Sequence, residues 1–142
     1  MTVDTARSLE GGCLCGALRF SISGPLGPIG HCHCRTCQKG QSAAFATTAR
    51  VAWDDFEWQS DESELRSYES TLGKKRSFCA RCGSKLFAAW DGEDELILRL
   101  GVLDSDPGTR PLVHIWTDHI QDWFDLRSSL PQFPRSVPPR KP

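Results

Sequence analysis

The chain of 142 residues carries 17 basic and 18 acidic side chains, and its formal net charge is −1 at pH 7. This balance excludes a general electrostatic attraction to nucleic acids or to anionic membranes. No apolar run approaches the roughly 20 residues that a membrane-spanning helix needs, and the first twelve residues lack the apolar core of a secretory signal. The length fits one domain, and we expect a cytoplasmic protein whose thiols stay reduced.

The predicted elements are mainly short strands. Period-two alternation predicts a strand over 17–23, and enrichment in Thr, Ala and Val predicts one over 45–51. Segments on either side of turn signals predict strands over 65–68, 75–78, 85–90 and 95–101, and a further strand is predicted over 112–117, after Pro111. Leu72-Gly73 predicts a turn between the third and fourth of these strands, and residues 91–94 predict a hairpin turn between the fifth and sixth. Residues 119–126 place three apolar side chains on one face and predict a short helix. The pattern indicates a mainly β domain.

Seven cysteines carry the chemistry that the sequence suggests, in three clusters: Cys13-x-Cys15, Cys32-x-Cys34-x-x-Cys37 and Cys79-x-x-Cys82. An odd number suits a complete set of disulfides poorly and suits four plus three metal ligands well. The Cys79–Cys82 pair is followed by Gly83, which is typical of a zinc knuckle. Cys13 and Cys15 lie among Gly11, Gly12 and Gly16, which leave the backbone free to curl, so they can complete a tetrahedral structural site.

The remaining cysteines, Cys32, Cys34 and Cys37, can hold a second ion and leave its fourth position open, which is the arrangement of a catalytic zinc. Thiolates select a soft metal such as zinc, so the sequence predicts two zinc ions per chain. One rival pairing stays open. Cys34 and Cys37 could join Cys79 and Cys82 in a single zinc ribbon, leaving the other three cysteines unused.

The segments GGCLCGALRF, HCHCRTCQKGQSAAF, LRSYESTLGKKRSFCARCGSKLF and RPLVHIWTDHIQDWFDL resemble the glutathione-dependent formaldehyde-activating enzyme (GFA) family. The resemblance covers roughly residues 10 to 134 and implies one β-tent, Mss4-like domain. Residues 1–9 then form an N-terminal tail, and the basic, proline-rich composition of 135–142 predicts a disordered tail.

The resemblance also implies ligand sets and an activity. It implies that a structural zinc is held by Cys13, Cys15, Cys79 and Cys82, and a catalytic zinc by Cys32, Cys34 and Cys37. The implied chemistry is that of a carbon–sulfur lyase, in which glutathione and formaldehyde combine reversibly to S-hydroxymethylglutathione. The expected partners are a small-molecule thiol and its aldehyde adduct, with no nucleic acid and no membrane. No oligomeric state is predicted.

Two further hypotheses concern the histidines and the cations near the cysteines. His33 should point away from the ligands on either side of it and be hydrogen bonded, whereas His114 is either a packed, hydrogen-bonded residue or an acid–base group. A fourth ligand from either histidine would close the open site and favour the alternative function, a non-catalytic zinc module that binds a protein. Arg35, Lys39 and Arg81 could bind the carboxylates of glutathione or be solvated surface charges, and they are left unassigned.

Overall fold

The computed structural model describes residues 8–138, whose regular structure is mainly β, as predicted. The strands are β1 (Leu9–Gly12), β2 (Arg19–Ile22), β3 (Ile29–Cys32), β4 (Ala46–Ala52), β5 (Phe56–Trp58), β6 (Leu65–Thr71), β7 (Lys74–Cys79), β8 (Lys85–Trp90), β9 (Glu95–Arg99) and β10 (Pro111–Ile115). The α-helix is α1 (Arg35–Gln41), and single 3-10 turns span Trp53–Asp55, Leu100–Val102 and Thr117–His119.

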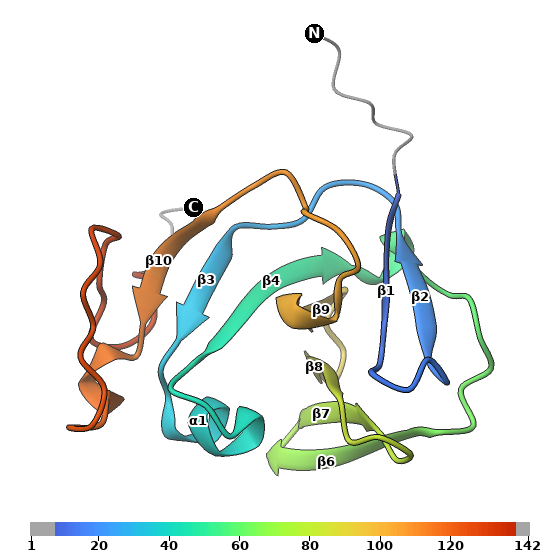
Figure 1. Ribbon diagram of the computed structural model, residues 1–142, viewed down its shortest axis with the longest axis horizontal. Coiled ribbons are helices and arrows are strands. Elements are labelled where there is room, and N and C mark those ends of the chain that lie inside the picture. Colours follow the sequence, from blue (N-terminus) through green and yellow to red (C-terminus); the bar gives the residue numbers. More distant parts are fainter. Residues whose placement is uncertain (1–7, 139–142) are drawn as a thin grey trace, which may run out of the picture.

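The strands form a large sheet in the order β10-β3-β4-β9-β8-β7-β6 and a small sheet in the order β1-β2-β5. Neighbouring strands are antiparallel except for β10, which lies parallel to β3. In Figure 1 the large sheet runs from β10 through β4 to the β6–β7 hairpin, and α1 lies between β4 and that hairpin. This arrangement brings α1, which directly follows β3, to the distant strands of the same sheet.

The main core lies between the two sheets. Phe20 and Ile22 of β2 are fully buried together with Leu86, Leu96 and Leu98 of the large sheet. The alternation predicted for β2 explains this, because every second side chain of the strand points to one face. Each fully buried side chain of this size contributes roughly 1.5–3 kcal/mol through the hydrophobic effect. Burial on this face therefore fixes the small sheet against the large one.

All seven predicted strands are present, with their ends shifted by a few residues. The predicted helix over 119–126 is wrong. The backbone turns at Trp116, whose φ is +60°, and only the single 3-10 turn Thr117–His119 follows. The N–H groups of Thr117 and Asp118 donate to the carbonyls of Phe133 and Pro134. Trp123, which the helix would have buried, is 70% exposed. A short helix without a buried face is only marginally stable.

The two predicted tails fall partly outside the described residues, which exclude 1–7 and 139–142. At the first boundary, Leu9 begins β1. At the second, the carbonyl of Arg135 accepts a hydrogen bond of 2.9 Å from Trp116 N. Within residues 8–138, no helix combines the length and apolar character that crossing a membrane requires.

Candidate metal centres

The seven cysteines lie in two groups, and each has a free thiol. Within each group all Sγ atoms lie within 4.8 Å of one another. The four-cysteine group contains Cys13, Cys15, Cys79 and Cys82, and the three-cysteine group contains Cys32, Cys34 and Cys37. This is the predicted division into four and three. The single-ribbon pairing does not match this division, because the Cys34–Cys37 pair and the Cys79–Cys82 pair lie in different groups.

The four-cysteine group has the spacing of a tetrahedral zinc site. Cys13 Sγ lies 3.6 Å from Cys15 Sγ, which lies 3.9 Å from Cys79 Sγ. Four sulfurs at tetrahedral corners, each about 2.3 Å from zinc, lie about 3.8 Å apart. These distances are much longer than a disulfide bond, which is about 2.0 Å. The donor set therefore fits one zinc ion.

Two facing turns build this group, one between β1 and β2 and the other between β7 and β8. Gly16 and Gly83 follow the two cysteine pairs with φ of +83° and +80°, and their N–H groups donate to the carbonyls of Cys13 and Cys79. Only glycine adopts such φ values without steric cost. Of the three N-terminal glycines, Gly16 alone lies in this turn, because Gly11 and Gly12 belong to β1.

The three-cysteine group lies where β3 passes into α1. Cys32 ends β3, Cys34 is the N-cap of α1, and Cys37 lies in the first turn of the helix. Cys34 Sγ accepts a hydrogen bond of 3.2 Å from Cys37 N, as a capping side chain does. Cys32 and Cys37 are buried, whereas Cys34 is half-buried. The group is therefore reachable from solvent on the Cys34 side.

Two arginines make this group electrostatically favourable for thiolates. Hydrogen bonds from Cys32 and Cys34, with the positive charges of Arg99 and Arg76, lower the pKa of Cys37 to about 2. Hydrogen bonds with Cys34 and Cys37 raise the pKa of Cys32. The surroundings thus favour the thiolate form of Cys37, and a metal that binds the group would displace the thiol protons, since only thiolates are strong ligands.

Neither histidine joins the three-cysteine group. His33 is fully buried, and its Nε2 lies 2.9 Å from His114 Nδ1, while His114 Nε2 lies 3.0 Å from Ser128 Oγ. The hydrogen bond predicted for His33 is present, and the bonds of His114 are compatible with either role considered for it. In the described part of the chain, no His, Asp or Glu side chain adds a fourth ligand atom to this group.

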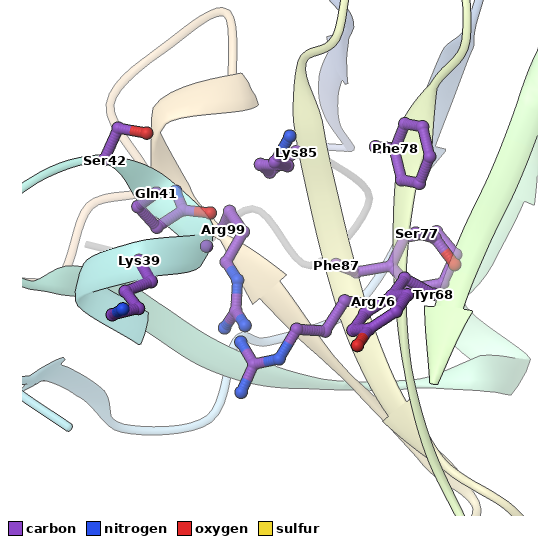
Figure 2. A pocket seen from close by; sticks show the side chains of 11 residues that line it. Lys39, Gln41, Ser42, Tyr68, Arg76, Ser77, Phe78, Lys85, Phe87 and Arg99 are labelled. Carbon is purple, nitrogen blue, oxygen red and sulfur yellow. The ribbon is translucent and has the colours of Figure 1, made fainter. Parts of the chain in front are cut away.

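A cavity of about 300 Å³ lies beside the three-cysteine group, between α1 and strands β6 to β9. Its wall contains four cations: Lys39, Arg76, Lys85 and Arg99. Figure 2 shows the guanidinium groups of Arg76 and Arg99 pointing toward one another. Arg76 Nη1 lies 3.8 Å from Cys37 Sγ, so the cavity and the cysteine group are adjacent.

Only one of these cations, Lys39, was expected from the sequence to lie near the cysteines. Lys39 lines the cavity, whereas Arg35 and Arg81 do not. Arg76 and Lys85 each lie three residues from a cysteine of the Cys79–Cys82 pair, one residue farther than Lys39 lies from Cys37, so a slightly wider proximity criterion could have found them. Arg99 has no such signal, because an arginine at a strand end is normally exposed.

Comparisons with known proteins agree on one family. The sequence profile of the glutathione-dependent formaldehyde-activating enzyme family matches residues 8–119. A protein of Halomonas elongata that is named after this family is 30% identical over 129 residues, which cover 84% of this chain and 82% of that protein. An uncharacterized lyase of Schizosaccharomyces pombe is 30% identical over 84 residues, 57% of each chain. A Rhodobacter sphaeroides crystal structure shares the fold, with a TM-score of 0.57 and 21% identity over 72% of this chain and 91% of that one.

Proposed function

The chain belongs to the glutathione-dependent formaldehyde-activating enzyme family, and on this premise we propose that it is a zinc-dependent enzyme of the carbon–sulfur lyase type. Its substrates are adducts of glutathione, or of a similar thiol, with formaldehyde or another small aldehyde. The observation that supports this most strongly is the three-cysteine group, which has no fourth protein ligand among residues 8–138 and lies beside a cavity.

The proposal gives the two cysteine groups different roles. Four thiolates saturate a zinc ion, so Cys13, Cys15, Cys79 and Cys82 form a structural site that ties the small sheet to the large one. Cys32, Cys34 and Cys37 form the catalytic site. A zinc ion bound there would supply a vacant position at which a thiol loses its proton.

The chain's own residues position the reactants and balance charge. Three thiolates reduce a divalent ion to a net charge near −1, which favours positioning of the thiol over activation of the carbonyl. Arg76 and Arg99 offset that negative charge. In the reaction the thiol sulfur forms a bond to the aldehyde carbon and the thiol proton ends on the aldehyde oxygen. In the reverse direction the carbon–sulfur bond breaks and both reactants are restored.

The alternative, a non-catalytic zinc module, would be favoured if His33 or His114 closed the three-cysteine group. The two imidazoles bind each other instead, which favours the enzyme. We also propose that residues 10–134 are the catalytic domain. The free, closely spaced thiols suit a reducing compartment such as the cytoplasm.

The test measures exchange between glutathione, formaldehyde and S-hydroxymethylglutathione by NMR, with the zinc-loaded protein and with a buffer control. We expect the wild type to exceed the spontaneous rate and Cys34→Ala to fall to it, because Cys34 is the half-buried member of the open group. Leu72→Ala, at the exposed tip of the β6–β7 hairpin, is the matched control and should keep the wild-type rate. An undiminished rate in Cys34→Ala would refute the proposed function.

A further inference from the structure

We propose that the cavity lined by Lys39, Arg76, Lys85 and Arg99 is an oxyanion subsite that binds a carboxylate of the thiol substrate while its sulfur occupies the three-cysteine site. This inference rests on the proposed function and narrows its substrate class to thiols that carry a carboxylate. The residues that form the subsite come from α1, β7, β8 and β9, so only the folded sheet assembles it.

The charge of the cavity wall is the first argument. It contains four cations and no carboxylate among the described residues, although the whole chain has a net charge of −1. The field of these arginines also reaches Lys74, whose pKa is lowered by burial and by the charges of Arg76 and Arg99. The charges of Arg76 and Arg99 repel one another, so an anion between them would relieve a repulsion that the protein maintains without it.

The second argument is the state of Arg99. Arg99 is only 5% exposed. Within residues 8–138, however, its guanidinium forms no ion pair and no side-chain hydrogen bond. A buried arginine normally has a carboxylate or several acceptors, because removing its charge from water is costly. The negative charge of the three-cysteine group offsets part of this cost. Its five N–H donors remain available to a ligand in the cavity that it lines.

The third argument is that Arg76 connects the two sites. Its Nε donates to Ser70 Oγ at 2.9 Å, which fixes the guanidinium, and its Nη1 lies 3.8 Å from Cys37 Sγ. One end of a substrate could therefore reach the cysteine group while another reaches the guanidinium pair. The planar guanidinium of arginine can donate two parallel hydrogen bonds to the two oxygens of a carboxylate, which favours a carboxylate over a monatomic anion.

The size of the cavity fits a part of a small molecule. About 300 Å³ is at the lower limit of ordinary ligand pockets. Phe78 and Phe87 add apolar surface to the wall, so the carbon skeleton of a peptide-like thiol could pack there while its carboxylate meets the arginines. A small neutral thiol such as 2-mercaptoethanol could occupy only the cysteine end.

The test separates the subsite from the chemistry by using S-methylglutathione, a thioether with both carboxylates and no free thiol. Its affinity for the zinc-loaded protein is measured by calorimetry beside that of its dimethyl ester, in wild type, Arg76→Gln and Arg99→Met. Arg50→Gln is the matched control, because this exposed arginine lies outside the cavity and pairs with Glu93 and Glu95. Zinc content and the unfolding midpoint verify that each variant is folded.

We expect the wild type to prefer the acid over the ester and Arg76→Gln to lose roughly tenfold in affinity for the acid, the loss of one charge-assisted hydrogen-bonded pair. Arg99→Met should lose at least as much, whereas Arg50→Gln should be unchanged. Equal binding of acid and ester, or unchanged affinity in a folded Arg76→Gln, would overturn the proposal. Inorganic phosphate that binds more tightly than S-methylglutathione would also overturn it, by showing a phosphate site.

Assays of adduct formation with formaldehyde distinguish a wrong subsite from a wrong proposed function. With glutathione, the arginine variants should raise KM roughly tenfold more than with 2-mercaptoethanol, which has no carboxylate. A change in kcat that arises from the charge Arg76 and Arg99 place beside the cysteines should be the same for the two thiols. Arg50→Gln should leave the constants of both thiols unchanged. Wild-type activity together with charge-independent binding would refute the subsite alone. Arginine-dependent binding without any activity would refute the proposed function and leave the anion site standing.

Discussion

The buried imidazoles of His33 and His114 are joined by a hydrogen bond of 2.9 Å between His33 Nε2 and His114 Nδ1. His33 Nδ1 has no partner within the described residues, so it must be the unprotonated nitrogen, because a buried N–H without an acceptor is costly. His33 Nε2 then donates to His114, and His114 Nε2 donates to Ser128 Oγ. This chain of bonds connects the residue after β3 to β10 and to the C-terminal segment.

We therefore predict that His114→Leu destabilises the zinc-loaded protein by about 1–3 kcal/mol, the cost of leaving the buried His33 donor unpaired. Urea unfolding followed by circular dichroism at pH 7 measures the change. Burial and the charges of His114 and His31 lower the pKa of His33 to about 4, so the imidazole is neutral at that pH. Ser128→Ala removes only the outer bond and should cost less. A His114→Leu protein as stable as wild type would contradict the inferred tautomers.

Sequence analysis recovered the parts of the fold that local patterns determine. The β6–β7 and β8–β9 pairs were predicted because each pair brackets a glycine-containing turn within about 15 residues of chain. Helix α1 was missed because RTCQKGQ has no apolar face. Its start is instead determined by the cap at Cys34. The parallel pairing of β10 with β3 joins segments about 80 residues apart, and no local pattern contains that information.

The candidate site was predicted unevenly for the same reason. Grouping of the cysteines followed from ligand number and spacing, which are chemical constraints that the sequence states directly. The subsite cations were mostly missed, because whether an arginine faces a cavity depends on sheet register. Arg99 follows the buried Leu98 on a strand where strict alternation would expose it, and yet it is almost fully buried.

The close approach at Gly11 predicts a second stability effect. A Cβ at this position would lie 2.4 Å from the carbonyl oxygen of Val102 and 2.6 Å from Phe20 Cζ. Gly11→Ala should therefore destabilise the protein by about 1–3 kcal/mol, as overpacking does.

Gly40 of α1 is the matched control, because a Cβ there meets nothing within 4 Å. Gly40→Ala should stabilise the folded protein by about 0.4–1 kcal/mol, because it lowers the conformational entropy of the unfolded chain. Thermal unfolding of both variants gives the comparison, and equal shifts of the same sign would contradict this interpretation.

The ion pair between Arg19 and Asp104 predicts a pH effect. The hydrogen bond and the charge of Arg19 lower the pKa of Asp104. A carboxyl with a depressed folded-state pKa stabilises the fold fully above its unfolded value, about 3.9, and loses this contribution as the pH falls through the folded value.

Asp104→Asn should therefore be slightly less stable than wild type at pH 6, and the two should converge as the pH falls below the lowered folded-state pKa of Asp104, where Asp104 is protonated in both states. Because both side chains are partly exposed, the difference at pH 6 should shrink in 1 M salt. Urea titrations at several pH values measure it. A difference that persists at low pH would show that the charge of Asp104 is not its cause.

The two cysteine groups should differ in how their loss affects the protein. We predict two zinc ions per chain in wild type, and one in Cys37→Ser or Cys79→Ser, because each substitution removes a ligand from one group only. Cys79→Ser should also destabilise the fold by about 4 kcal/mol or more, the contribution of a ligand present at 1,000 times its dissociation constant. The four-cysteine group joins two turns that are 64 residues apart in the chain, whereas the three-cysteine group lies within a segment of six residues. Elemental analysis measures the zinc content, and urea unfolding measures the stability. If the wild type bound a single zinc ion and Cys37→Ser bound none, the single-ribbon pairing would be correct.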